Sequence, residues 1–227
     1  MMSEILRLND VSREYVRGGV PFFAVKHVNL TLESGDFVNI IGRSGSGKST
    51  LVNIAAGMLT PTSGSVELFG EDLAGKSDVY LSRLRNDRIG FIPQGMSLLP
   101  NLTVLENVVL PFFMYHHGGD GEGYGRIMLD RMEILHLADS YPAELSGGEM
   151  RRAVIARAMV NRPEIVIADE PTSDLDVISA QNIMNIFAEL NSEGLTLLVV
   201  SHDLEAVKYG RRVFTMDNGT LTEGRHI

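Results

Sequence analysis

The chain of 227 residues contains no cysteine, which excludes disulfide bonds and thiolate metal sites and suits a reducing cytosol. Basic residues are also in the minority, with 20 Lys and Arg against 29 Asp and Glu, a formal net charge of −9. A protein that binds nucleic acid through its phosphates needs an excess of basic residues. We therefore expect no nucleic-acid partner, and any phosphate site must depend on local geometry.

Long hydrophobic runs are missing as well. The longest, such as 108–114, are far shorter than the roughly 20 residues of a membrane-spanning helix. Residues 1–4 lack a basic region followed by an apolar core, so we expect no signal peptide. Any connection to a membrane would therefore go through a partner. The length and the 44% hydrophobic content predict one well-buried domain.

The apolar patterns predict an α/β fold. Alternation at 5–8 and 28–32 predicts half-buried antiparallel strands, with a break at Gly18-Gly19. Three later runs are almost wholly apolar, as strands covered on both faces tend to be; they are 37–41, 165–168 and 197–200. Helical patterns lie between these runs, so we expect a mostly parallel sheet.

The middle of the chain has a different pattern. Residues 104–160 are helical in pattern, without a clear strand, and are interrupted by a glycine-rich loop at 116–123, which we interpret as a flexible connection. We expect a helical subdomain at 95–160, inserted between a strand near 89–92 and the strand at 165. Residues 1–94 and 161–227 would then form the catalytic core with its antiparallel part.

A glycine-rich segment directly follows the apolar run at 37–41. It fits the pattern G-x-x-x-x-G-K-[ST] of a nucleotide phosphate loop, with a strand before it and a helix after it. Glycine permits backbone conformations in which successive amides curl around an anion, and the helix start adds free N–H groups. The alternative is a turn that only caps a helix. The candidate binding residues are Gly42, Arg43, Ser44, Gly45, Ser46, Gly47, Lys48, Ser49 and Thr50.

The end of this loop predicts ATP or GTP with Mg²⁺. Lys48 would reach the β- and γ-phosphates, and the Ser49 hydroxyl would ligate the metal. Asp169 and Glu170 end the apolar run that begins at Ile165, where ligands bind in α/β sheets. Asp169 can hold Mg²⁺ directly or through water, and Glu170 can polarise the attacking water. The alternative is an acidic turn at a strand end.

The segment Leu145-Ser146-Gly147-Gly148-Glu149 begins another helix. Its hydroxyl and exposed amides offer a second anion site, although taken alone it is usually a plain helix cap. In this order the three motifs resemble the nucleotide-binding subunit of an ATP-binding-cassette (ABC) transporter, over essentially the whole chain. The resemblance implies a head-to-tail dimer with two ATP molecules, each completed by Ser146, Gly147, Gly148 and Glu149 of the other subunit. It also implies an integral-membrane permease as partner, and a position at the cytoplasmic face of the membrane.

The resemblance assigns roles to four further residues. Tyr15 matches the aromatic that stacks on adenine, and Gln94 matches the glutamine that touches Mg²⁺ and senses the membrane partner. Asp176 matches the acidic position of the segment that crosses the dimer interface. His202 matches the histidine that contacts the γ-phosphate. Read singly, these would be a strand aromatic, a loop residue, a helix N-cap and a structural histidine.

The segments 96–100 and 103–111 are similar to the lipoprotein-release and macrolide-export branch, and the compact ending at Ile227 agrees. Pro93, Asp174 and the pair Gly95-Met96 depart from the pattern of that branch. The expected function is an ATPase that drives an exporter or transmits mechanical motion. The alternatives are a regulatory cassette that acts on a membrane protein controlling cell-wall enzymes, and a soluble ABC-type ATPase without a permease.

Overall fold

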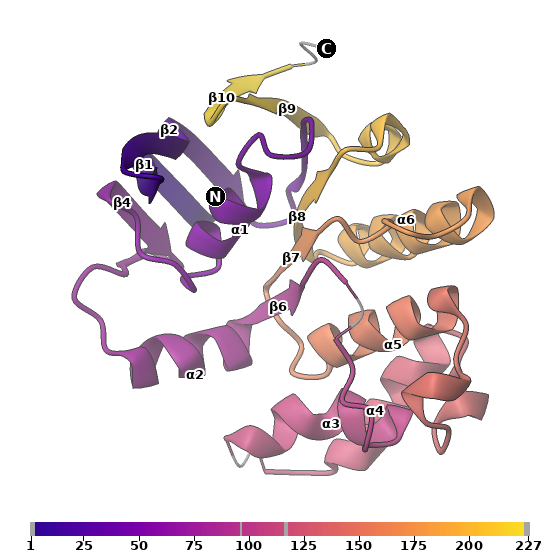
Figure 1. The fold of residues 1–227 in the computed structure, drawn as a ribbon. Coiled ribbons are helices and arrows are strands. Elements are labelled where there is room, and N and C mark those ends of the chain that lie inside the picture. Colours follow the sequence, from indigo (N-terminus) through magenta and orange to yellow (C-terminus); the bar gives the residue numbers. More distant parts are fainter. Residues whose placement is uncertain (1–2, 96, 116–117, 225–227) are drawn as a thin grey trace.

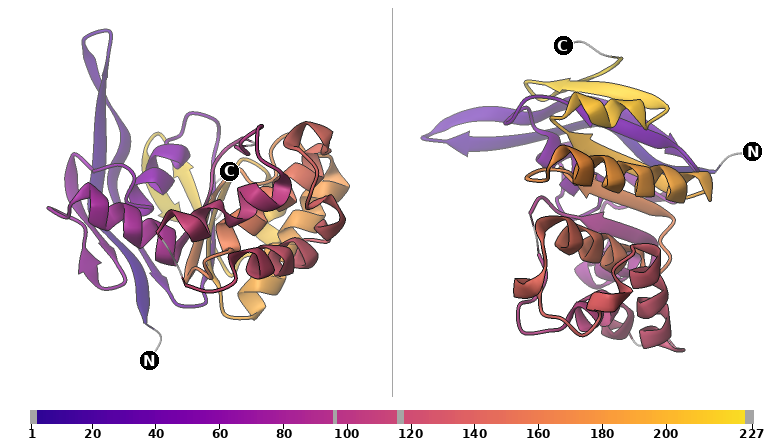
Figure 2. Two further views of the ribbon diagram at one scale, coloured as in Figure 1. Left: turned by 90° about the horizontal axis from the view of Figure 1, so that it is seen from below. Right: turned by 90° about the vertical axis from the view of Figure 1, so that its right-hand side faces the viewer.

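The computed structural model describes residues 3–95, 97–115 and 118–224, which fold around two β-sheets (Figure 1). The first sheet is antiparallel, in the order β2 (Val20–Glu33), β1 (Glu4–Arg17), β4 (Ser63–Leu68) and β5 (Glu71–Asp72). β1 and β2 form a long hairpin that extends beyond the rest of the molecule (Figure 2). The predicted antiparallel pair at 5–8 and 28–32 is thereby confirmed, and the turn at Gly18-Gly19 has φ angles of 59° and 81°.

The second sheet is mostly parallel. Its order is β10 (Thr220–Glu223), β9 (Arg212–Asp217), β3 (Phe37–Ile41), β8 (Thr196–Ser201), β7 (Ile165–Asp169) and β6 (Ile89–Ile92). All neighbours from β9 to β6 run in parallel, and β10 is antiparallel to β9. The three predicted buried strands are the adjacent central strands β3, β8 and β7. The α/β expectation is therefore confirmed.

Both faces of the parallel sheet are covered, which explains the almost wholly apolar sequences of its central strands. In β8, Leu198 and Val200 face a core shared with the antiparallel sheet and α1 (Lys48–Ala55). Leu197 and Val199 face the opposite core, which helices between residues 104 and 192 complete. Successive side chains of one strand thus pack into two different cores.

The remaining helices lie along or below the parallel sheet in Figure 1. They are α2 (Asp78–Arg88), α3 (Val104–Met114), α4 (Gly121–Arg131), α5 (Gly147–Met159) and α6 (Val177–Ser192), with the short 3-10 helices η1 (Leu135–Leu137), η2 (Pro142–Glu144) and η3 (Leu204–Lys208). Between β6 and β7 in the sequence come α3, α4 and α5, which pack against one another. The two strands themselves pair directly. The bounds 95–160 for an inserted subdomain stay a prediction.

One element boundary was predicted wrongly. The glycine-rich loop was expected to run to Gly123, but α4 begins at Gly121 because the Asp120 side chain caps the helix by accepting the Gly123 N–H. The other part of that prediction, at 116–117, lies outside the described residues, as do Met96 and residues 1–2. Within the described ranges, no helix combines the length and the apolar character that a membrane crossing requires.

Candidate functional site

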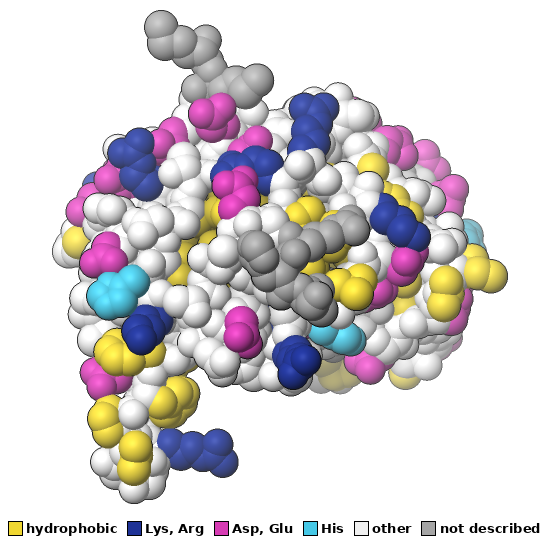
Figure 3. Space-filling model, turned by 90° about the horizontal axis from the view of Figure 1, so that it is seen from above, with side chains coloured by type: hydrophobic (Ala, Val, Ile, Leu, Met, Phe, Trp, Pro, Cys, Tyr) yellow, Lys and Arg dark blue, Asp and Glu magenta, His cyan; other side chains and the backbone are white. Residues whose placement is uncertain are grey.

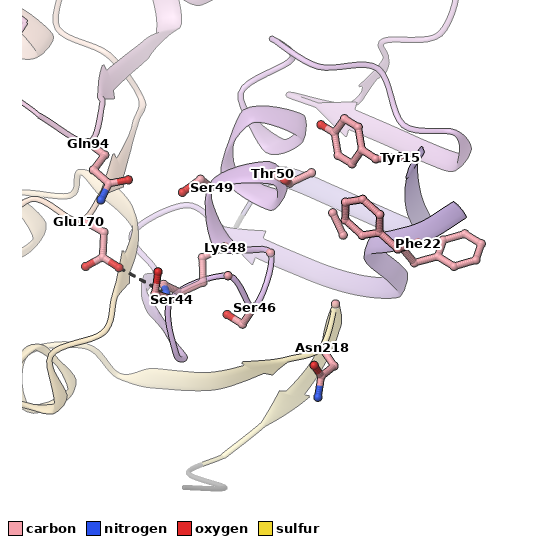
Figure 4. A pocket seen from close by; sticks show the side chains of 15 residues that line it. Tyr15, Phe22, Ser44, Ser46, Lys48, Ser49, Thr50, Gln94, Glu170 and Asn218 are labelled. Atoms are coloured by element: carbon pink, nitrogen blue, oxygen red, sulfur yellow. Dashed lines mark ion pairs between the residues drawn. The ribbon is translucent and has the colours of Figure 1, made fainter. Parts of the chain in front are cut away.

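A pocket of about 540 Å³ opens between the phosphate loop, the β1–β2 hairpin and the segment after β6 (Figure 4). It brings together most of the predicted site residues from elements far apart in the sequence. Gln94 and Glu170 lie at one end, Lys48 lies between, and Tyr15 lies at the other end. The lining residues are Tyr15, Phe22, Phe23, Ala24, Ser44, Gly45, Ser46, Gly47, Lys48, Ser49, Thr50, Gln94, Glu170, Asn218 and Gly219.

The glycines of the phosphate loop are required for two different reasons. Gly45 and Gly47 have φ angles of 79° and 109°, in the region that favours glycine, as the sequence predicted. Gly42 does not adopt such an angle. Instead, a Cβ there would lie 2.3 Å from the carbonyl oxygen of Met216, so the close approach of β9 excludes a side chain. A Cβ at Gly47 would lie 2.0 Å from the carbonyl oxygen of Ala24.

The loop presents unsatisfied donors to the pocket. α1 begins at Lys48 without a side-chain cap, so the first N–H groups of the helix remain available to an anion. The Ser46 hydroxyl lines the pocket, is buried and has no hydrogen-bond partner among the described residues. Buried polar groups are normally paired. The orphaned hydroxyl and the uncapped helix therefore fit a nucleotide phosphate.

Lys48 and Glu170 form a buried ion pair, with 3.3 Å between Nζ and Oε1. The ammonium group also donates to the carbonyl oxygens of Gly42 at 2.8 Å and Arg43 at 3.1 Å. The second carboxylate oxygen of Glu170 accepts the His202 N–H at 3.1 Å and lies 2.8 Å from His202 Nδ1. One carboxylate thus connects the phosphate-loop lysine with the histidine after β8.

The backbone of Glu170 is held in an unusual conformation. Its φ is 51°, a left-handed value that is uncommon outside glycine. Its N–H donates to the Val200 carbonyl, and its own carbonyl accepts from the N–H and the hydroxyl of Ser173. Such local strain persists only where surrounding contacts enforce it, and it is frequent at functional sites.

Asp169 lies beside Glu170 at the end of β7 and is 4% exposed. Burial raises the pKa of its carboxyl above the ordinary value, and a contact with the Ser49 hydroxyl opposes that shift. Its Oδ1 atom has no hydrogen-bond partner among the described residues. A buried carboxylate with a free oxygen beside a hydroxyl is a donor set that suits a divalent cation. Asp169 and Ser49 therefore fit the predicted Mg²⁺ ligands.

Two aromatic rings border the opposite end of the pocket. The rings of Tyr15 and Phe22 lie 5.9 Å apart between centroids, with 30° between their planes. Phe22 was missed in the sequence, although the signal was available: a two-residue turn at Gly18-Gly19 pairs position 15 with position 22, as the hairpin register shows. Together the rings offer a stacking surface for a nucleobase. Phe23, Ala24, Asn218 and Gly219 also line the pocket and were not predicted.

Nine predicted residues do not line this pocket. Gly42, Arg43, Asp169 and His202 adjoin or contact residues that do, and the other five form the starts of α5 and α6. Ser146 caps α5, and its hydroxyl and N–H both donate to Glu149, whose pKa these bonds lower. Gly147 and Gly148 form the first turn of the same helix. Asp176 caps α6 and accepts from the Ser179 hydroxyl, which lowers the pKa of its carboxyl. In the single chain these residues therefore serve as helix starts.

The chain matches a known family over most of the residues that build this pocket. Residues 25–173 match the profile of the family described as ABC transporter. The chain belongs to the ABC transporter family. It is an ATP-binding cassette with ATPase activity.

Relatives within the ABC transporter family cover nearly the whole cassette. The chain is 41% identical over 230 residues to the lipoprotein-releasing system ATP-binding protein LolD of Hydrogenovibrio crunogenus, covering 100% of this chain and 97% of that protein. It is 35% identical over 223 residues to the macrolide export ATP-binding/permease protein MacB of Syntrophobacter fumaroxidans, covering 96% of this chain but only 31% of MacB. The chain likewise spans 35% of the probable syringafactin export protein SyfD of Pseudomonas syringae.

Solved ABC cassettes share the fold. A dimeric structure of the cassette MJ0796, in a post-hydrolysis state bound to ADP and Pi, has a TM-score of 0.90 at 36% identity. The match covers 98% of this chain and 100% of that one. The protein of the same name from Methanocaldococcus jannaschii is 38% identical over 223 residues, covering 96% of this chain and 95% of that protein.

Proposed function

We propose that two copies of this ABC cassette close head to tail on two ATP molecules, hydrolyse them with Mg²⁺, and drive an integral-membrane permease from the cytoplasmic face of the membrane. Dimeric structures of a similar cassette support the dimer. The single observation that carries the proposal is the division of the predicted residues: residues 44–50 of the phosphate loop line one pocket, whereas Ser146 begins a helix outside it.

The pocket residues would act on the phosphates. Lys48 would exchange its carbonyl contacts and its ion pair with Glu170 for phosphate oxygens. Asp169, Ser49 and Gln94 would hold Mg²⁺, which when bound neutralises charge on the phosphates. Released from Lys48, Glu170 would orient and polarise the attacking water. His202, already hydrogen-bonded to Glu170, would lie next to the γ-phosphate.

The remaining predicted residues would complete the site from the second copy. The start of α5 combines a helix N-terminus, two glycines and the Ser146 hydroxyl, a combination that binds anions. The Ser146 hydroxyl donates to the Glu149 carboxylate, and phosphate oxygens would replace that carboxylate as its acceptor. Because these groups contribute only across the interface, an isolated copy should hydrolyse ATP poorly. Asp176, on the exposed start of α6, would lie at the same interface.

The relatives support one branch of permease. Similarity to LolD and MacB over nearly the whole chain supports a lipoprotein-release or macrolide-export type of system, in which the cassette transmits motion to the permease. The copurifying membrane protein tests this branch directly. A permease with four transmembrane helices and a large extracytoplasmic domain would support it, whereas one with ten or more spans would reject it.

The dimer is tested with the variant Glu170→Gln, which slows hydrolysis while keeping the shape of the side chain. With Mg-ATP we expect it to elute from gel filtration as a dimer, and with Mg-ADP as a monomer. The double variant Lys48→Ala/Glu170→Gln is the matched control, because it lacks the phosphate-loop cation and should stay monomeric. A Glu170→Gln chain that remains monomeric at saturating Mg-ATP would reject the dimer.

A further inference from the structure

The guanidinium group of Arg151, on α5, is buried without adequate partners. The residue is 0% exposed, and its Nε and Nη2 atoms have no hydrogen-bond partner among the described residues. Nη1 donates to the carbonyl oxygens of Pro93 at 3.4 Å and Gly95 at 3.5 Å, both beyond ordinary N–H···O distances. A buried charge with so few partners is costly to the fold. This conformation therefore leaves Arg151 poised to accept a partner.

The two carbonyl contacts place Arg151 next to the nucleotide pocket. Pro93 and Gly95 flank Gln94, whose side chain lines the pocket opposite the phosphate loop (Figure 4). Arg151 belongs to the helix that Ser146 caps. It thus connects the helix of the second anion site with the segment that positions Gln94.

Asp174 supplies a matching negative charge. Burial lowers the pKa of the Arg151 guanidinium, and the charge of Asp174 opposes this shift. Asp174 lies on the exposed turn between β7 and α6, with a left-handed φ of 63°. No hydrogen bond joins the two side chains in this conformation.

We propose that Arg151 is a positioning residue for Gln94, and that its free nitrogens pair with Asp174 when nucleotide closes two copies of the chain. This inference rests on the proposed dimer. The pair forms only in the closed state, so it stabilises that state relative to the open one. It also fixes the carbonyl groups on either side of Gln94, and thereby the carboxamide itself, when ATP is in place.

A double-mutant cycle tests the pair. Arg151→Gln and Asp174→Asn should each lower kcat about tenfold, with little change in the KM for ATP, because each leaves one charge uncompensated. The double variant should recover to within about threefold of the wild-type kcat, because a neutral Gln–Asn pair leaves no uncompensated charge. Arg157→Gln is the matched control, since Arg157 lies on the same helix but bonds Ser97. Asp174→Asn should not rescue it.

Additive losses in the cycle would overturn the inference. If Arg151→Gln fails to fold, Asp174→Asn alone tests the pair, because Asp174 is exposed and its replacement does not disturb the core. An unchanged kcat in Asp174→Asn would then reject the pair. The dimer is followed separately, by gel filtration in the Glu170→Gln background. If the Glu170→Gln chain with Arg151 and Asp174 intact does not dimerise, the proposed function is rejected. If it dimerises but the losses of kcat in the cycle are additive, only the Arg151–Asp174 pair is rejected.

Discussion

The Glu170 carboxylate lies 3.3 Å from the Lys48 ammonium nitrogen, and both side chains are almost fully buried. Glu170, the proposed general base, thus neutralises the lysine that would bind phosphate. Glu170→Gln should lower ATP turnover by about 100-fold or more, the usual contribution of a general base. It should not weaken ATP binding, because it removes an anion that competes for Lys48. Steady-state turnover and equilibrium binding on the same preparation measure both effects, and wild-type turnover would remove Glu170 from its assigned role.

Two glycines of the phosphate loop should respond differently to alanine. Gly47→Ala should abolish ATP binding, because its Cβ would lie 2.0 Å from the Ala24 carbonyl oxygen and force the loop apart. Gly45→Ala is the matched control, since a Cβ there would meet open space and only the left-handed φ of 79° opposes the substitution. Its cost should be about 1 kcal/mol of stability, with binding retained. Calorimetric titration with ATP separates the two, and equal losses would contradict this account of the loop.

Asp169 makes stability depend on pH. Burial raises its pKa in the folded chain, so the neutral form is favoured by folding. This contribution to stability is fully present below the unfolded pKa and is lost as the pH rises through the folded pKa. Without nucleotide and Mg²⁺, Asp169→Asn should therefore unfold at higher denaturant than wild type at pH 7. The difference should shrink as the pH falls toward about 4, near the ordinary pKa. A wild type that is the more stable chain at pH 7 would contradict the assignment.

The paired rings of Tyr15 and Phe22 should set nucleotide affinity. Stacking of a base on an aromatic side chain is worth about 1–3 kcal/mol, so Tyr15→Ala should raise the Kd for ATP at least about fivefold. Phe22→Ala should act in the same direction. Val20→Ala is the control, because Val20 lies at the exposed end of the same hairpin and does not line the pocket. Hydrophobic side chains gather on that end, which is the projecting lobe in Figure 3. Titration with a fluorescent nucleotide measures the Kd of each variant. An unchanged Kd in Tyr15→Ala would refute the stacking role.

The parts predictable from the sequence are those in which neighbouring residues act together. The phosphate loop is one uninterrupted segment, so its spacing alone indicates where amides converge. The strands at 37–41, 165–168 and 197–200 follow from burial on both faces, and the helix start at Ser146 follows from its capping residues. Asp169 and Glu170 could be placed because parallel strands end at one edge of the sheet.

The parts that escaped prediction depend on register and on long-range contacts. Phe22 joins Tyr15 only through the pairing of β1 with β2, and Gly42 is a glycine only because β9 passes close to it. The contacts of Glu170 with Lys48 and His202 join residues that follow three separate strands, β7, β3 and β8. The apolar pattern around Arg151 predicts a helix, but not that its charge is buried against the Gln94 segment. No local pattern encodes such contacts, because tertiary packing creates them.

The shared site is tested most directly by mixing two defective chains, both in the Glu170→Gln background. One also carries Lys48→Ala, and the other carries Ser146→Arg, which blocks the start of α5. Neither alone can assemble a complete site, but a head-to-tail pair of the two contains one, made of Lys48 from one copy and Ser146 from the other. We predict that the mixture retains ATP through rapid gel filtration, while each chain alone does not. A mixture that retains no more ATP than its parts would contradict the dimer.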